Sequence, residues 1–256
     1  MTYVDVARAT SERGEVVLRR RAADDDVTTT AYGGGHVGGH VGGPTVLELR
    51  VNGVFVMDSA ENASEVAMAR VALERCPTPR TVLVGGLGLG FTTHEVLADD
   101  RVERVVVAEI EEALVGWFRD GTVPHGPTYL ADERLHVHVG DVRQVVAESP
   151  PASVDLVLLD VDNGPGFLVH AGNSLIYQGP FLRQVHDLLR PDGVVVVWSS
   201  TDDEALTDAL TDVFGTCTVE SHPVRLQDRD EQYWLHLAQR PAQRLAQRPT
   251  DPRETR

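Results

Sequence analysis

Short apolar runs alternate with longer mixed segments from residue 81 onward. Five runs rich in Val and Leu have the length of buried strands: 82–84, 105–108, 135–139, 156–159 and 194–198. Five segments predicted as helices separate or follow them: 92–98, 111–119, 143–148, 179–189 and 203–214. Strands that alternate with helices form a mostly parallel sheet with helices on both faces. The pattern therefore predicts a doubly wound α/β fold.

Residues 1–60 are predicted to form a small antiparallel β unit. Residues 14–19 have the composition of a strand. Apolar alternation at 46–51 and 54–57 flanks Asn52-Gly53, a pair that favours a tight hairpin because both turn positions need positive φ.

Residues 61–239 are expected to form the main α/β domain. A helix over 64–76 precedes the first strand, and a turn at 191–193 precedes the fifth. Two further strands are predicted to close the sheet as an antiparallel pair: 218–224 and 232–238.

Two segments are predicted to lack regular structure. Residues 33–44 are too rich in glycine to bury a core, and 240–256 form a polar tail that we expect to be disordered. His36 and His40 lie in the first segment, but two His without a nearby acid or Cys make a poor metal site. No metal is therefore expected.

The net charge limits the partners. The 256 residues carry a formal charge of −16. Nucleic acids and anionic membranes bind basic surfaces, so neither is expected as a partner. An acidic chain suits a cationic substrate such as an amine, although an acidic surface also serves solubility alone.

The two cysteines and the N-terminus predict a cytoplasmic location. Cys76 and Cys217 match no metal spacing and are expected to be buried thiols in a reducing compartment. The N-terminus lacks an apolar signal region, and no stretch approaches the roughly 18 apolar residues of a membrane span.

The stretch Thr81–Gly90 joins the first buried strand to a helix through a glycine turn. Gly86, Gly88 and Gly90 stand at alternate positions, and glycine lets a backbone approach a ligand closely because it has no Cβ. The dinucleotide pattern G-x-G-x-x-G fails at Phe91, and a P-loop would need a Lys, which this chain lacks. What remains is the G-x-G-x-G turn of S-adenosylmethionine (SAM) enzymes, or a tight turn without a ligand.

Acidic residues follow the other strands, where a doubly wound sheet binds its ligands. Glu109 ends the second strand, Asp141 follows the third, and Asp160 and Asp162 follow the fourth. An acid at the position of Glu109 can accept two hydrogen bonds from ribose hydroxyls. Asp141 is alternatively the N-cap of the next helix. Together these positions predict a nucleoside site.

The chain resembles the spermidine synthase (polyamine aminopropyltransferase) family, within the Rossmann-like class I SAM-dependent methyltransferase fold. The resemblance covers roughly residues 14–238. Besides the N-terminal β unit, it rests on these segments: Gly85–Gly90, Glu109–Glu111, Gly140-Asp141, Leu159-Asp160 with a following Gly-Pro, Leu175–Tyr177 and Leu189–Gly193.

The resemblance implies roles for several of these residues. Glu109 would hold the ribose diol, and Asp141 would accept a hydrogen bond from the adenine amine. The backbone from Gly85 to Gly90 would pack against the methionine-derived chain, and Asp160 would lie beside the sulfonium. The resemblance further implies SAM or decarboxylated SAM as co-substrate, and a homodimer.

Three departures from the family concern the groups that bind amines. The family carries an Asp in the glycine turn where this chain has Gly88. Its second Asp after the fourth strand corresponds to Asn163, and Asp162 is one residue away. Its Tyr-His pair is absent after Glu65. Carboxylates that would hold a diamine are therefore partly missing.

The expected chemistry is displacement at a sulfonium, in which the protein aligns a nucleophile and removes its proton. Asp160 and Asp162 are the candidate acids or bases. Tyr177 is expected to line the acceptor pocket or to pack against the sheet. His170 is a candidate base, with a solvated loop His as the favoured alternative. Trp198 is either a pocket wall or, as we favour, core.

Several functions follow from these features. The first is a spermidine synthase-like transfer of an aminopropyl-type group to an amine-like small molecule. The second is methyl transfer from SAM, favoured because Gly88 would not repel the SAM carboxylate. The third is a catalytically inert nucleoside-binding homologue, and Phe91 opposes a fourth, an NAD enzyme.

Overall fold

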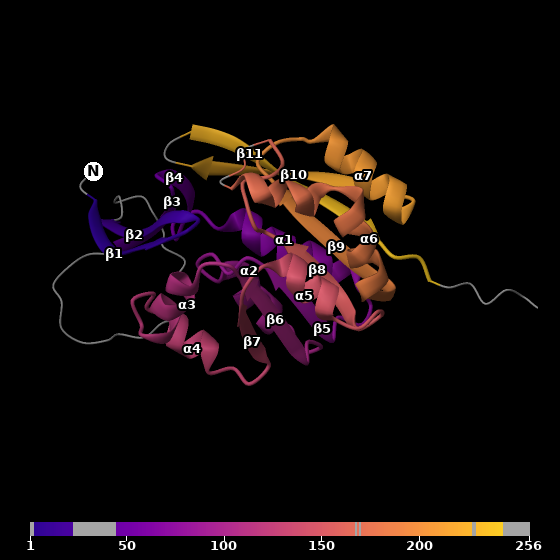
Figure 1. The fold of residues 1–256 in the computed structure, drawn as a ribbon, viewed down its shortest axis with the longest axis horizontal. Coiled ribbons are helices and arrows are strands. Elements are labelled where there is room, and N and C mark those ends of the chain that lie inside the picture. The colour runs from indigo at the N-terminus through magenta and orange to yellow at the C-terminus, as the bar shows by residue number, and fades with distance from the viewer. Residues whose placement is uncertain (1–2, 23–44, 167, 169, 227–228, 243–256) are drawn as a thin grey trace, which may run out of the picture.

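The N-terminal region forms a four-stranded antiparallel sheet in the computed structural model, which describes residues 3–22, 45–166, 168, 170–226 and 229–242 (Figure 1). Its strands pair in the order of the chain: β1 (Val4–Ser11), β2 (Gly14–Ala22), β3 (Thr45–Val51) and β4 (Val54–Asp58). The predicted hairpin is confirmed, with φ of 52° at Asn52 and 77° at Gly53. The sequence analysis missed β1, most of whose side chains are exposed.

The main sheet has seven described strands in the order β10-β11-β9-β8-β5-β6-β7. Their bounds are β5 (Thr81–Gly85), β6 (Arg104–Glu109), β7 (Leu135–Val139), β8 (Val154–Leu159), β9 (Leu189–Ser199), β10 (Thr218–Leu226) and β11 (Arg229–Gln239). The five strands from β5 to β9 are parallel, and β10 and β11 form the predicted antiparallel pair. β11 also pairs antiparallel with β9 and so joins that pair to the sheet. After β5 the chain forms β6 on one side of β5, and it later forms β8 on the other side. The strand order therefore reverses between β5 and β8, which flank the topological switch point.

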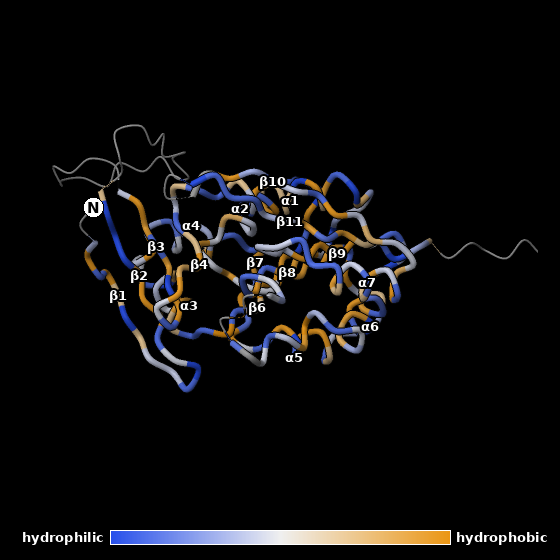
Figure 2. The backbone as a smooth tube through the Cα atoms, turned by 90° about the horizontal axis from the view of Figure 1, so that it is seen from above, coloured by the Kyte–Doolittle hydropathy of each residue, from blue (hydrophilic) through white to orange (hydrophobic). Residues whose placement is uncertain are grey.

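Helices cover both faces of this sheet, which confirms the predicted doubly wound fold (Figure 2). Successive strand residues point to opposite faces, as Val82 and Leu83 do. One face packs against α1 (Ala63–Arg75), α2 (Phe91–Leu97), α3 (Glu112–Arg119) and α4 (Gly126–Leu130). The other packs against α5 (Val142–Glu148), α6 (Gly179–Leu188), α7 (Glu204–Phe214) and the 3₁₀ helix η1 (Ala171–Tyr177).

The N-terminal sheet shares its core with the first of these faces. Leu18, Leu49 and Met57 are buried in the same apolar cluster as Met68 of α1 and Val84 of β5. This shared core holds the small sheet beside the carboxyl ends of the parallel strands.

Two differences from the expected elements have clear physical reasons. The sequence analysis missed α4 and η1, since both are too short to show helical periodicity. The predicted turn at 191–193 lies within β9, where the pairing with β8 shifts register between Val154 and Leu156. Asp192 there has a φ of 66°, so the residues expected to turn the chain form a bulge.

The two segments predicted to lack regular structure, 33–44 and 240–256, lie largely outside the described residues. The Gly/His segment 33–44 lies outside the described residues, and so do 243–256 of the expected tail. Arg240, counted in that tail, pairs with the β9 bulge, because its N–H donates to the Gly193 carbonyl and its carbonyl accepts from the Asp192 N–H. In the part of the chain that the structure describes, no helix is long and apolar enough to cross a bilayer.

His236 of β11 makes the stability of this fold pH-dependent. It is fully buried, with Nδ1 3.1 Å from the Thr207 hydroxyl of α7, and burial lowers its pKa. An unfolded His binds a proton near pH 6.5, whereas this folded His resists it. The contribution of His236 to stability should therefore fall as the pH drops through about 6.5, whereas Glu65 and Asp160, with pKa values raised to about 8 and about 6, act in the opposite direction in this range.

The measurement is the thermal unfolding midpoint from pH 5 to 7.5. Between pH 5 and pH 7.5 the midpoint of His236→Leu should rise less, or fall more, than that of the wild-type chain, because the contribution of His236 is lost. His136→Leu is the matched control, since His136 is an exposed strand histidine of β7. A wild-type slope in both variants would assign the dependence to other groups.

Candidate active site

A cavity of about 320 Å³ lies between the N-terminal sheet and the carboxyl ends of the parallel strands. Its floor comes from the segments that follow β5, β6, β7 and β8, and from Trp198 at the end of β9. The facing wall comes from β2, β3 and β4, and Glu65 of α1 also contributes. The cavity therefore lies at the point where the strand order reverses, between β5 and β8, which is the place at which doubly wound sheets bind ligands.

The glycine turn after β5 forms part of this floor through Gly86 and Gly88. Gly86 has a φ of 93°, and a Cβ on it would lie 2.0 Å from the Asp160 carbonyl oxygen. Only glycine permits this approach of the turn to the end of β8. Gly85 and Gly90 pack against neighbouring side chains, and neither is among the described residues that line the cavity.

Met57 of β4 fills the space beside Gly88. A Cβ on Gly88 would lie 2.7 Å from the Met57 Sδ, and the Leu89 N–H points at the same sulfur from 3.1 Å. The place where the resemblance expects an Asp therefore faces a thioether. No local pattern indicates this contact, because Met57 lies in β4 and Gly88 in the turn after β5.

Glu109 ends β6 on the cavity wall and is 6% exposed. Its carboxylate accepts from the Leu87 N–H at 2.8 Å and from the Glu111 N–H at 2.7 Å. Burial raises the pKa of Glu109, and these two backbone donors oppose the rise. The carboxylate thus ties the glycine turn to the loop after β6.

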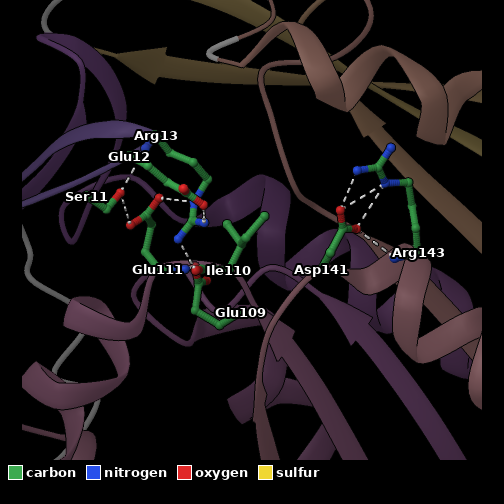
Figure 3. A network of polar contacts seen from close by, with 8 residues as sticks. All are labelled: Ser11, Glu12, Arg13, Glu109, Ile110, Glu111, Asp141 and Arg143. Carbon is green, nitrogen blue, oxygen red and sulfur yellow. Dashed lines mark hydrogen bonds and ion pairs between the residues drawn. The ribbon is translucent and has the colours of Figure 1, made fainter.

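Arg13, in the turn between β1 and β2, links the N-terminal sheet to that loop (Figure 3). Its Nε donates to Glu111 Oε1 at 2.8 Å, and its Nη2 donates to the Ile110 carbonyl at 2.5 Å. These partners are almost a hundred residues apart in the chain, so sequence reasoning could not pair them.

Asp141 lies apart from this group, after β7 (Figure 3). It is the N-cap of α5, as the alternative interpretation predicted, because its Oδ1 accepts from the Arg143 N–H at 2.8 Å. The Arg143 guanidinium also donates to both carboxylate oxygens. Burial pushes the pKa of Asp141 upward, but the bonds from Arg143 outweigh it and hold the pKa below its usual value.

Asp160 and Glu65 bring two carboxyls to the cavity without a cation. Asp160 is half-buried after β8, and Glu65 of α1 is 8% exposed, with the Ser64 hydroxyl 2.7 Å away. Burial raises the pKa of both, and the charge of Asp160 raises that of Glu65 further. Neither forms an ion pair with any described residue.

Sequence reasoning did not select Glu65 as a site residue. A signal was present, since Glu65 shares the buried side of α1 with Val66, Met68 and Ala69. Burying an acid on the apolar face of a helix costs free energy unless the acid is paired or hydrogen-bonded. Such an acid is therefore a candidate for a residue that meets a ligand.

Asp162 also lines the cavity, in a fixed orientation. Its carboxylate accepts from the Asn163 N–H and from the Asn173 amide, each at 2.8 Å. Asn163 and His170 lie on the same wall. In the described part of the chain, no three His, Cys, Asp or Glu side chains gather as a metal site would need.

Tyr177 and Trp198 have different positions relative to the cavity. Tyr177 packs in the core and is not among the described residues of the wall. Burial, with the charges of Asp162 and Asp160, raises the pKa of Tyr177, so its phenol stays neutral. Trp198 belongs to both the core and the cavity wall. It is 7% exposed and lines the cavity, and its ring centroid lies 4.7 Å from that of Tyr233.

Comparison with known proteins agrees with this architecture. A spermidine synthase crystallised with the transition-state analogue AdoDATO has a TM-score of 0.67 at 16% identity, and covers 92% of this chain and 73% of its own. The spermidine synthase of Thermotoga maritima has a TM-score of 0.65 at 15% identity, and the match covers 92% of this chain and 72% of that protein. At such identities the likeness concerns the fold.

Sequence relatives point to the same group. Polyamine aminopropyltransferase 2 of Pseudomonas aeruginosa is 31% identical over 61% of this chain and 46% of its own length. Polyamine aminopropyltransferase of Aeropyrum pernix is 29% identical over 59% and 50%. Putrescine N-methyltransferase 3 of Nicotiana tabacum is 28% identical over 50% and 32%. The chain thus spans about half the length of the first two relatives, and less of the third.

The sequence profile of the spermine/spermidine synthase domain matches residues 61–210, more than half of the chain. The match includes the glycine turn, Glu109, Asp141 and Asp160, which form one side of the cavity. The chain therefore belongs to the spermine/spermidine synthase family.

Proposed function

We propose that this chain transfers an aminopropyl group from decarboxylated SAM to the nitrogen of a small amine. The observation that carries the proposal is that one cavity holds Glu109 and Asp160 on opposite sides of the glycine turn. Since β6 and β8 flank β5, and neighbouring strands lie about 4.8 Å apart, the strand ends that carry Glu109 and Asp160 are roughly 10 Å apart. A nucleoside sulfonium suits this spacing, with its ribose at Glu109 and its sulfur near Asp160.

The reaction needs no group beyond the donor, the amine and a base. The lone pair of the amine nitrogen attacks the propyl carbon bonded to sulfur, and the C–S bond breaks. Its electron pair stays on sulfur, which leaves neutral 5′-methylthioadenosine, and the nitrogen releases a proton. Asp160 is the proposed base, and burial favours proton uptake by raising its pKa. Asp162, held by Asn163 and Asn173, is the proposed orienting acid.

Methyl transfer from SAM is the second candidate, and Met57 is the observation that favours it. The Met57 Sδ occupies the space beside Gly88, so no carboxylate stands there to favour the terminal amine of decarboxylated SAM over the amino acid end of SAM. The putrescine N-methyltransferase relative also supports this candidate. Against it, the SAM carboxylate would lie beside Asp160 and Glu65 without a cation to balance it, because both arginines of the cavity wall are already paired.

The donor can be identified by calorimetric titration of the purified chain with SAM and, separately, with decarboxylated SAM. We expect decarboxylated SAM to bind at least about tenfold more tightly, because a carboxylate near two acids costs on the order of 1.4 kcal/mol or more. Tighter binding of SAM would favour methyl transfer. Binding of neither would favour the inert homologue.

Asp160→Asn should separate chemistry from nucleoside binding. Loss of the base should lower turnover by about a hundredfold or more, the usual contribution of general base catalysis. Binding of neutral 5′-methylthioadenosine should change less than threefold, since the amide is nearly isosteric, whereas cationic decarboxylated SAM should bind more weakly. Full turnover in this variant would remove Asp160 from the mechanism.

Arg143→Ala tests the proposed role of Asp141 toward the adenine amine. Arg143 now occupies both carboxylate oxygens, so its removal should free an acceptor and tighten 5′-methylthioadenosine binding about fivefold, the effect of one hydrogen bond. Arg134→Ala is the matched control, because Arg134 binds Asp132 in the same way. Weaker binding in Arg143→Ala alone would mean that Arg143 itself contacts the nucleoside.

A further inference from the structure

The cavity receives side chains from both faces of the main sheet, and its walls differ on the two sides. Glu65 of α1 and Met57 of β4 line it on the face that α1 and α2 cover. Asp162 and Asn173 line it on the other face, where η1 packs. Gly88 faces the first side, because a Cβ on it would meet the Met57 Sδ at 2.7 Å. A ligand group that lies beside the glycine turn here therefore meets α1 and β4.

Decarboxylated SAM brings two positive charges to this cavity, its sulfonium and the ammonium at the end of its aminopropyl chain. In the proposed reaction the sulfonium lies near Asp160. The ammonium extends from the same sulfur and needs a counter-ion of its own, because an unpaired buried cation is strongly unfavourable. Gly88 and Met57 provide none, since one has no side chain and the other ends in a thioether.

Glu65 is the carboxyl that α1 brings to this side of the wall. It is 8% exposed, and it accepts a hydrogen bond from the Ser64 hydroxyl at 2.7 Å. No ion pair joins it to a described residue. Burial raises its pKa to about 8, and the charge of Asp160 contributes to the rise. The two carboxyls are therefore close enough to interact, and a ligand with two linked cationic centres would balance both.

Asp162 is the competing acid of the wall, since it is also buried and accepts from the Asn163 N–H and the Asn173 amide. It lies on the η1 side of the cavity. In the proposed transfer the amine nitrogen attacks the propyl carbon from the side opposite to sulfur, and the rest of the aminopropyl chain points away from that line. The acceptor and the donor ammonium therefore need separate places. Asp162 is the proposed orienting acid, and Glu65 remains for the donor.

We infer that Glu65 binds the terminal ammonium of decarboxylated SAM while Asp160 balances its sulfonium; this inference rests on the proposed aminopropyl transfer. Glu65 is thus a specificity-determining residue for the donor. It attracts a chain that ends in an ammonium, and it disfavours the amino acid end of SAM, whose carboxylate would lie beside it.

The test isolates the ammonium with two nucleosides that contain a neutral thioether and cannot react. 5′-(3-Aminopropyl)thioadenosine and 5′-butylthioadenosine differ in having an ammonium or a methyl group at the end of the chain. Calorimetric titration at pH 8.5 favours the ionised form of Glu65. We expect the aminopropyl compound to bind the wild-type chain at least about tenfold more tightly, and Glu65→Gln to lower this affinity ratio about tenfold.

Glu65→Gln should fold, because the amide is nearly isosteric and removes a buried charge, and its thermal unfolding midpoint checks this. Glu61→Gln is the matched control. The charge of Glu61 acts on both Glu65 and Tyr233, but Glu61 is not among the described residues that line the cavity. Its removal should change the affinity ratio less than threefold. Equal losses in the two variants would assign the preference to the general acidic field and overturn the inference.

Asp162→Asn tests the competing assignment. An affinity ratio that falls in Asp162→Asn but persists in Glu65→Gln would place the ammonium at Asp162, and would also overturn the inference. So would equal affinities of the two nucleosides for the wild-type chain. These outcomes concern binding and leave the proposed transfer intact.

Failure of the proposed function has a different signature. If small amines and decarboxylated SAM release no 5′-methylthioadenosine while the affinity ratio depends on Glu65, the transfer is overturned. Glu65 then remains the site of a nucleoside ammonium, without the role in selecting a donor.

Discussion

The carboxylate of Glu109 is the contact on which the cavity depends. It accepts from the N–H groups of Leu87 and Glu111, and so fixes the glycine turn against the loop after β6. Glu111, held in that loop, then receives Arg13 from the N-terminal sheet. One buried acid thus sets the shape of the floor and, through its neighbour, the position of the facing wall. Its raised pKa reflects the cost of burial, which the two backbone donors offset only in part.

A second constraint is the presence of Glu65 and Asp160 in a largely apolar surrounding. A buried acid beside a half-buried one, with no counter-ion, destabilises a fold, and acids with raised pKa values of this kind are concentrated at functional sites. The same cavity wall contains Met57 and Trp198, which provide no charge. A cation that binds here would therefore stabilise the protein as well as react in it, and this couples ligand binding to stability.

Family membership and the chemistry of this site are separate conclusions. Residues 61–210 match the family profile, and the fold agrees with spermidine synthases across both sheets. Gly88 and Asn163, however, stand at positions where the resemblance implies an Asp. A shared fold does not by itself fix the reaction, which depends on a few residues of the cavity wall.

Sequence patterns alone predicted the doubly wound fold, the Asn52-Gly53 hairpin and the strand-end positions of Glu109 and Asp160. These features are encoded locally, through apolar period, turn chemistry and the rule that parallel strands present their carboxyl ends together. Sequence patterns failed where short segments lack a period, as in α4, and where turn residues form a bulge within a paired strand, as at Asp192.

Only the tertiary structure decided which distant residues share the cavity. The contact of Met57 with Gly88, the link from Arg13 to Glu111 and the pairing of Glu65 with Asp160 each join separate elements. Tyr177, chosen from its place in the sequence, proved to be buried behind the wall. Side-chain contacts of this kind depend on how the two sheets pack, and no local pattern in one segment records the residue that will face it from another.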